Sequence, residues 1–398
     1  MNVDPTSERL PSGTPPQNLC MDFEVYANEP VMRFLVHHCR SSPTTLILGF
    51  YGLVTVPLFV MSAFSQPPCP VGKECLSFRE SISWSYSVIF LFPFVVGLTL
   101  VYYRKIPELY KFLIKELLEE GNQSDIRNFL EVQRKRFTEH WSPFLLFLLT
   151  LILNGVYFRQ VLNDEQFDWM NSGSLFKDLL NTAHGLTWQG LYAALVQIVL
   201  IYWVLNLIWK GFVLAFGLRE FFNEARLGIK LDPLHPDGVC GLRPIGRVAS
   251  TLNFILFLIG IYLSLKVIDK TVVQGSSLFE DIGNPVMLGG YAILAPLLFF
   301  LPLAAAHDRM LNAKDRFLRP ISARCHVLVQ QIGAMKPDGH GVEHTISLSL
   351  LEKLRDDLNK TIPVWPFDFK SLQVFFGAVV VPLLPIIFPV LAKLLLQK

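Results

Sequence analysis

Long uncharged apolar segments alternate with charged connecting segments along this chain. A helix that spans a membrane needs about 20 mostly apolar residues, and its backbone polar groups must be hydrogen-bonded within the segment. Seven segments meet or nearly meet this requirement, although those at 141–158 and 249–265 are short. The pattern predicts an all-α, polytopic helical membrane protein with about seven spans, at 44–63, 81–103, 141–158, 187–209, 249–265, 285–306 and 371–392.

Two of the connections carry apolar residues at helical spacing. In 104–140 one stripe begins at Ile106, with Pro107 in a first helical turn, and a second helix is expected from about Ser124. In 307–370, stripes around Met310 and Leu350 flank a turn composed of KPDGHG. We expect these helices to form hairpins on the cytoplasmic side and to pack on each other, between subunits, or both.

The positions of the lysines and arginines predict the orientation, because positive residues stay cytoplasmic. The amino-terminal segment and the connections after the second, fourth and sixth spans hold 27 of them, and the remaining segments hold 8. The expected organisation is a partly disordered cytoplasmic segment (1–43), spans one and two (44–103), a cytoplasmic hairpin (104–140), spans three and four (141–209), a cytoplasmic loop (210–248), spans five and six (249–306), cytoplasmic helices (307–370) and span seven (371–398). Three prolines allow span seven to be a re-entrant hairpin instead.

Composition agrees with a membrane protein. Hydrophobic residues make up 52% and charged residues 17%, against about 25% charged in soluble domains. The net charge of +2 argues against nucleic acid as a partner. The expected partners are the lipid bilayer, further copies of this chain, and a cytoplasmic protein.

The stretch 231–242, LDPLHPDGVCGL, is the most distinctive part of the sequence. His235, Asp237 and Cys240 are weak candidates for a metal or proton site, and the alternative is a rigid loop in which Asp237 caps a turn.

This loop, together with VWPFD before the last predicted span, resembles an uncharacterised group of bacterial multi-pass membrane proteins. Their loop is similar but has glycine where this chain has Cys240. The resemblance covers about twenty residues, implies a bacterial inner (plasma) membrane protein, and implies no activity.

A second weak metal candidate is the H-x-x-E-H sequence formed by His340, Glu343 and His344. The chemistry of that motif requires a helix, which the neighbouring glycines and Pro337 disfavour. In the predicted exterior loop, Cys69 and Cys75 are candidates for a disulfide. No catalytic residue and no cofactor are predicted, because the chain has no glycine-rich phosphate loop, nucleophile elbow or pair of catalytic carboxylates.

Polar residues within the spans are the default pointers to function in a membrane protein. The candidates are Asn154, Gln197, Asn206 and Asn253, and no aspartate or glutamate falls within a predicted span. Prolines in the last two predicted spans favour contact with the interior or with a wet cavity. The best hypothesis is a homo-oligomeric channel or passive pore. The alternatives are a membrane-anchored sensor or scaffold that binds a cytoplasmic partner, and a metal-dependent membrane enzyme.

Overall fold

A computed structural model gives the fold. It describes residues 25–380 and 384, except 26, 38–41, 65–77, 79–80, 119–122, 164–169, 171–172, 181, 183–184, 225–228, 230, 234, 270–282, 335–340, 363, 367–371, 374 and 378. The described part is almost entirely helical and contains no strand. Its α-helices are α1 (Pro30–His37), α2 (Pro43–Phe50), α3 (Val56–Phe64), α4 (Ile82–Tyr86), α5 (Phe92–Leu117), α6 (Gln123–Thr138), α7 (Trp141–Asn163), α8 (Lys177–Leu180), α9 (Trp188–Asn223), α10 (Arg243–Ile268), α11 (Gly283–Ala334) and α12 (Gly341–Thr361).

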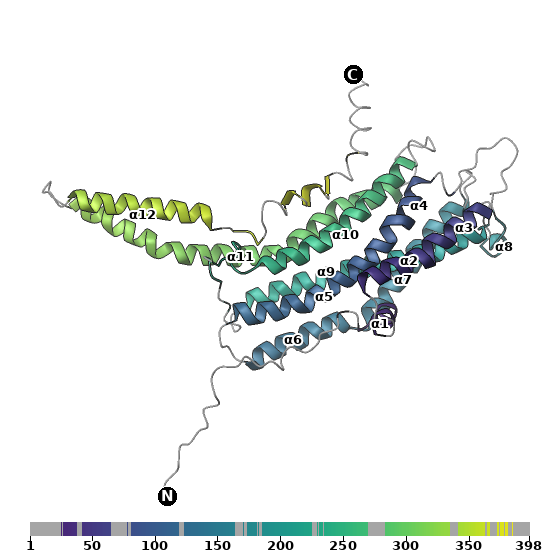
Figure 1. Ribbon diagram of the computed structural model, residues 1–398, viewed down its shortest axis with the longest axis horizontal. Helices are drawn as coiled ribbons and strands as arrows, with labels where there is room; N and C mark the ends of the chain where they lie inside the picture. Colours follow the sequence, from purple (N-terminus) through teal and green to yellow (C-terminus); the bar gives the residue numbers. More distant parts are fainter. Residues whose placement is uncertain are drawn as a thin grey trace, which may run out of the picture.

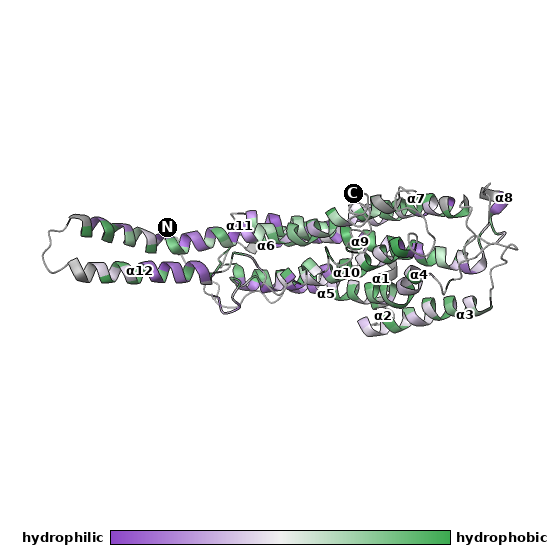
Figure 2. Ribbon diagram, turned by 90° about the horizontal axis from the view of Figure 1, so that it is seen from above, coloured by the Kyte–Doolittle hydropathy of each residue, from purple (hydrophilic) through white to green (hydrophobic). Residues whose placement is uncertain are grey.

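Six helical segments of the described chain are long and apolar enough to cross a membrane. They are Pro43–Phe64, Ile82–Leu117, Ser124–Arg159, Trp188–Asn223, Arg243–Ile268 and Val286–Ile332. They overlap the first six predicted spans, so the prediction of a helical protein with apolar helices of membrane-spanning length is confirmed. Most of the seventh predicted span lies outside the described residues. Figures 1 and 2 show the apolar helices side by side in one elongated bundle.

Three helices, α5, α9 and α11, continue without interruption past the ends of the membrane segments that the sequence predicts. The second span and the helix expected from Ile106 form the single helix α5, with Pro107 inside it, so the separate start expected at Pro107 is wrong. The sixth span continues in the same way through the 52 residues of α11, which then pairs with α12. Figure 1 shows this α11–α12 hairpin projecting beyond the bundle. Around Pro107 the side chains of Tyr103, Ile106 and Tyr110 are buried, and this packing keeps α5 continuous despite the missing backbone donor.

The first two spans each contain one turn of π-helix, η1 (Tyr51–Thr55) and η2 (Ser87–Leu91). A π-turn leaves backbone carbonyls poorly paired within their own helix. Here the hydroxyl of Tyr51 donates to the carbonyl of Ile89 at 2.6 Å, and the hydroxyl of Thr55 donates to the carbonyl of Val88 at 2.9 Å. The side chains of η1 therefore satisfy backbone carbonyls of η2 and fix the register of these two spans.

A buried aspartate connects the end of α10 to the start of α4. The carboxylate of Asp269 accepts hydrogen bonds from the backbone N–H groups of Ile82 at 3.2 Å and Ser83 at 2.8 Å, and from the hydroxyl of Ser81 at 3.3 Å. The first N–H groups of a helix have no partner within the helix, and a carboxylate is a favourable cap for them. The contact holds the two helix ends together on the side of the bundle opposite the α11–α12 hairpin (Figure 1).

Candidate functional site

An acidic side chain that precedes every candidate span lies in the interior of the bundle. Glu29 stands directly before α1, and its side chain is 1% exposed. In Figure 1, α1 lies near the junction of α6 and α7. Neither carboxylate oxygen of Glu29 has a well-formed hydrogen bond within the described chain, although the polar groups of Tyr103 and Asn206 lie close to it. An acidic group in such a position is a functional pointer, because burying an unpartnered charge is costly.

Lys210 from α9 enters the same region and is fully buried. Its ammonium group donates to Oδ1 of Asn28 at 3.1 Å and to the backbone carbonyl of Phe137. The amide of Asn28 in turn donates to the carbonyl of Glu139 at 2.7 Å. These bonds tie the segment before α1 to α9 and to the junction between α6 and α7.

The surroundings of Glu29 oppose its ionisation. Burial raises the pKa of Glu29 from 4.5 to about 7, and the ammonium of Lys210 and the polar groups of Tyr103 and Asn206 offset part of that effect. The side chains of Tyr103 and Asn206 are themselves buried, and their hydroxyl and amide groups have no other hydrogen-bond partner among the described residues. We call Asn28, Glu29, Tyr103, Asn206 and Lys210 the buried polar cluster. It is able to bind a proton near neutral pH.

The four polar span residues predicted from the sequence are all buried, but only one joins this cluster. Asn206 lies beside Glu29. Asn154 donates to the carbonyl of Thr150 at 2.9 Å within its own helix, and its amide oxygen has no partner in the described chain. The side-chain oxygens of Gln197 and Asn253 likewise lack a hydrogen-bond partner among the described residues.

Sequence reasoning included neither Glu29 nor Lys210 among the candidate residues. The predicted span ranges contain no acidic residue, but a segment from outside them carries Glu29 into the bundle. The local signal in the sequence is weak: an acidic residue precedes a proline and the short apolar helix α1.

The loop between α9 and α10 contains His235, Pro236, Asp237 and Gly238, and we call it the HPDG loop. It is organised around the carboxylate of Asp237. Its Oδ1 accepts from the backbone N–H groups of Val239 and Gly241, both at 2.9 Å, and its Oδ2 accepts from the backbone N–H of Arg243 at 3.3 Å. Nδ1 of His235 lies 2.9 Å from Oδ1. Burial raises the pKa of Asp237, but these hydrogen bonds outweigh burial and hold the pKa below its usual value. Asp237 therefore caps the start of α10, as the structural alternative in the sequence analysis expected.

Cys240 occupies a backbone conformation that favours glycine. Its φ is 57°, and the flanking Gly238 and Gly241 have φ of 70° and 81°. Glycine adopts such positive angles without steric cost, which gives a physical reason for the glycine in the pattern that this loop resembles. The thiol of Cys240 is buried, and burial raises its pKa to about 11. A neutral buried thiol is a poor metal ligand.

The metal candidates that the structure describes are not brought together, and the disulfide candidates lie outside the described residues. No group of three or more histidine, cysteine, aspartate or glutamate side chains is arranged for a metal among the described residues. Glu343 and His344 lie in the first turn of α12, contrary to the expectation that no helix forms there. His340 lies outside the described residues, as do Cys69 and Cys75.

Replacing Asp237 with alanine is expected to lower the free energy of unfolding by about 2–3 kcal/mol, because two buried N–H groups and the first turn of α10 lose their acceptor. Asparagine, which keeps one oxygen acceptor, is expected to cost less. Because the pKa of Asp237 is depressed, its contribution is present above the unfolded-state pKa of 3.8 and is lost as the pH falls below it. Equilibrium unfolding in mixed micelles at pH 7 and pH 3 measures this, and equal stability of Asp237→Ala and wild type at pH 7 would contradict it.

No known protein family, no curated protein and no solved structure matches this chain.

Proposed function

We propose that this integral membrane protein is a homo-oligomeric channel or passive pore. The observation that supports the proposal is the set of buried polar groups without partners inside an apolar bundle. Amide oxygens of Asn154, Gln197 and Asn253 have no hydrogen-bond partner among the described residues, and the carboxylate of Glu29 is only partly satisfied by Tyr103, Asn206 and Lys210. An unsatisfied polar group in a membrane interior costs several kcal/mol, so these groups require water or an ion as a partner.

The chemistry of these atoms favours cations or water as the permeating species. Most are carboxylate or amide oxygens, which are the ligands that hard cations prefer, and acidic side chains are typical of cation pathways. The positive charge of Lys210 offsets part of the negative charge of Glu29. A site in a pathway must bind weakly enough for release.

Apolar surface outside the membrane supports the assembly of several copies. The α11–α12 hairpin exposes Val327, Ile346 and Leu350, the last of them 62% exposed. Apolar patches that face water mark sites of protein association. These residues come from both helices of the hairpin, so we propose that its apolar surface packs against the hairpin of a second copy.

Conductance of the reconstituted protein tests the proposal. Purified protein in planar bilayers is expected to give a cation conductance, and Asn206→Leu is expected to reduce it by at least tenfold by removing a polar group from the cluster. The control is Asn223→Leu, the same change at an exposed position on the same helix. Silent bilayers that contain correctly inserted wild-type protein would refute the channel.

The exposed hairpin also favours a second candidate, a membrane-anchored scaffold that binds a cytoplasmic protein. Native mass spectrometry distinguishes the two. A stoichiometric oligomer that Leu350→Ser dissociates supports assembly of this chain. The scaffold is supported if the protein is a monomer and crosslinking in cells joins it to one stoichiometric partner protein. The variant Leu350→Ser is then expected to lose that partner.

A further inference from the structure

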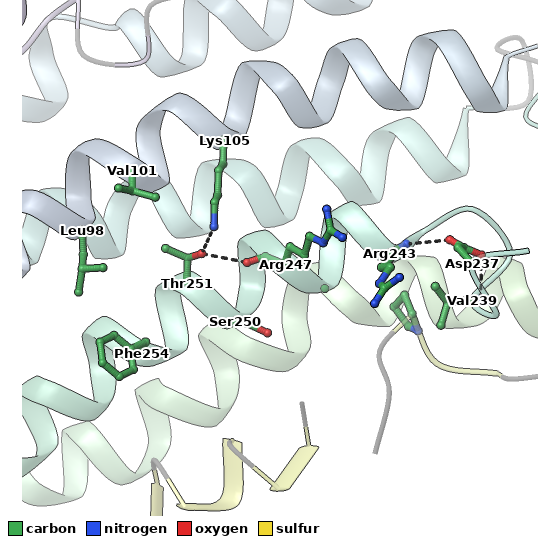
Figure 3. A pocket seen from close by; sticks show the side chains of 12 residues that line it. Leu98, Val101, Lys105, Asp237, Val239, Arg243, Arg247, Ser250, Thr251 and Phe254 are labelled. Atoms are coloured by element: carbon green, nitrogen blue, oxygen red, sulfur yellow. Dashed lines mark hydrogen bonds between the residues drawn. The ribbon is translucent and has the colours of Figure 1, made fainter. Parts of the chain in front are cut away.

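Beside the HPDG loop lies a cavity of about 560 Å³ between the facing sides of α5 and α10. Three of the side chains that line it are basic: Lys105 from α5, and Arg243 and Arg247 from the first two turns of α10. The hydroxyls of Ser250 and Thr251 line it as well. Figure 3 shows these groups along one stretch of the cavity.

Among the described residues, the positive charges in the cavity are only partly offset, by Glu108 beside Lys105 on α5. The guanidinium groups of Arg243 and Arg247 form no ion pair with any described residue. The ammonium of Lys105 donates to the hydroxyl of Thr251 at 2.8 Å, which leaves two of its N–H donors free of hydrogen bonds within the described chain. Lys105 and Arg247 are close enough to repel each other.

The one acidic side chain in the lining does not compensate these charges. Asp237 directs its carboxylate to the backbone N–H groups of its own loop and of Arg243. Figure 3 shows it at the far end of the cavity from Lys105, bonded to the start of α10. The hydroxyl of Thr251 donates to the backbone carbonyl of Arg247 at 2.9 Å, so it serves to position Lys105. The cavity therefore offers three cations and the hydroxyl of Ser250 to an anion.

The other end of the cavity is apolar. Leu98 and Val101 lie on α5, and Phe254, which is 44% exposed, lies on α10. Leu98 precedes Lys105 by seven residues on α5. At 1.5 Å per helical residue it lies about 10 Å from Lys105 along the helix axis, toward the apolar middle of the span. The cavity is therefore basic at the end with Arg243 and Arg247 and apolar at the end with Leu98 and Phe254 (Figure 3). A membrane changes in the same order, from polar head groups to hydrocarbon.

We propose that this cavity is a binding site for a phosphate-bearing anion, with Lys105, Arg243 and Arg247 holding the phosphate. Arginine pairs with phosphate oxygens through two parallel N–H donors, and lysine acts as a point charge beside them. A phospholipid fits the whole cavity, since its acyl chain lies along Leu98, Val101 and Phe254 while its phosphate meets the basic end. Basic pockets between spans at the membrane boundary are typical of anionic lipid head groups. A free phosphate compound uses only the basic end.

Binding of defined probes to the delipidated full-length protein in detergent tests this. Dioctanoyl phosphatidic acid is titrated by native mass spectrometry, and inorganic phosphate by calorimetry. We expect Arg247→Gln and Lys105→Gln each to weaken binding of the lipid by about tenfold, as the loss of one charge-assisted contact predicts. Arg219→Gln, the same charge change at an exposed site on α9, is expected to leave binding unchanged.

A second variant distinguishes the two sources of phosphate. Phe254→Ser is expected to weaken the lipid and leave inorganic phosphate unaffected, which supports a lipid site. A site for a soluble phosphate compound is supported by two results together. Inorganic phosphate then binds tightly and Arg247→Gln weakens its binding, while Phe254→Ser leaves the lipid affinity unchanged. Equal lipid binding by wild type and the triple variant Lys105→Gln/Arg243→Gln/Arg247→Gln, with thermal stability retained, would overturn the proposal. So would equal binding of uncharged dioctanoylglycerol.

Discussion

Replacing Lys210 with methionine is expected to lower the free energy of unfolding by about 3–5 kcal/mol at pH 8, the usual cost of removing one partner from a buried charged pair. Methionine keeps the length of the side chain but removes its charge and its donors. Oδ1 of Asn28 and the carbonyl of Phe137 then lose the ammonium group that donates to them, and the buried carboxylate of Glu29 loses its opposite charge. Equilibrium unfolding in mixed micelles measures the loss.

The matched control is Arg219→Met, which removes a positive charge from an exposed position on the same helix. Its effect is expected to be within about 0.5 kcal/mol, as for most surface substitutions. Similar stabilities of Lys210→Met and wild type would show that the hydrogen bonds of Lys210 do not hold the segment before α1 in place.

The membrane helices could be predicted from the sequence because one physical requirement dominates them. A spanning segment must be apolar over about 20 residues and must satisfy its backbone internally, and both conditions are visible in a single stretch of sequence. The full lengths of α5 and α11 could not be predicted in the same way. Pro107 reads locally as a helix start, but packing on both sides of it keeps α5 continuous.

The candidate sites were harder to predict because they combine distant segments. Asn206 was identifiable, since a polar residue in an apolar span is conspicuous. Glu29 was not, because nothing in the local pattern shows that the segment before α1 turns into the bundle. In the same way, Lys105 and Arg247 look like ordinary flanking charges until α5 and α10 are placed side by side. The role of Asp237 as a cap was accessible, because the turn composition of its loop is local.

Replacing Glu29 with glutamine is expected to change how the free energy of unfolding depends on pH. The pKa of Glu29 is 4.5 in an unfolded chain and about 7 in the folded protein. Between these values the folded state binds more protons than the unfolded state, so the contribution of Glu29 to stability falls as the pH rises. The full loss is about 3 kcal/mol, because each pKa unit corresponds to about 1.4 kcal/mol. Glutamine is uncharged at every pH and does not incur this loss.

The stability of Glu29→Gln relative to wild type is therefore expected to rise by about 3 kcal/mol between pH 4 and pH 8, since titrating groups that do not interact with Glu29 cancel in the difference. Glu224→Gln, at an exposed position at the end of α9, is expected to show no such trend. A difference in stability that stays constant with pH would mean that Glu29 titrates near its ordinary value.

The double variant Glu29→Gln/Lys210→Met tests whether charge links the two side chains. The effects of the two changes on stability are expected to be coupled at pH 8, where Glu29 is mostly charged, and to become additive at pH 4, where Glu29 is protonated. Coupling that persists at pH 4 would point to hydrogen bonding or packing, and not charge, as the link between the two side chains.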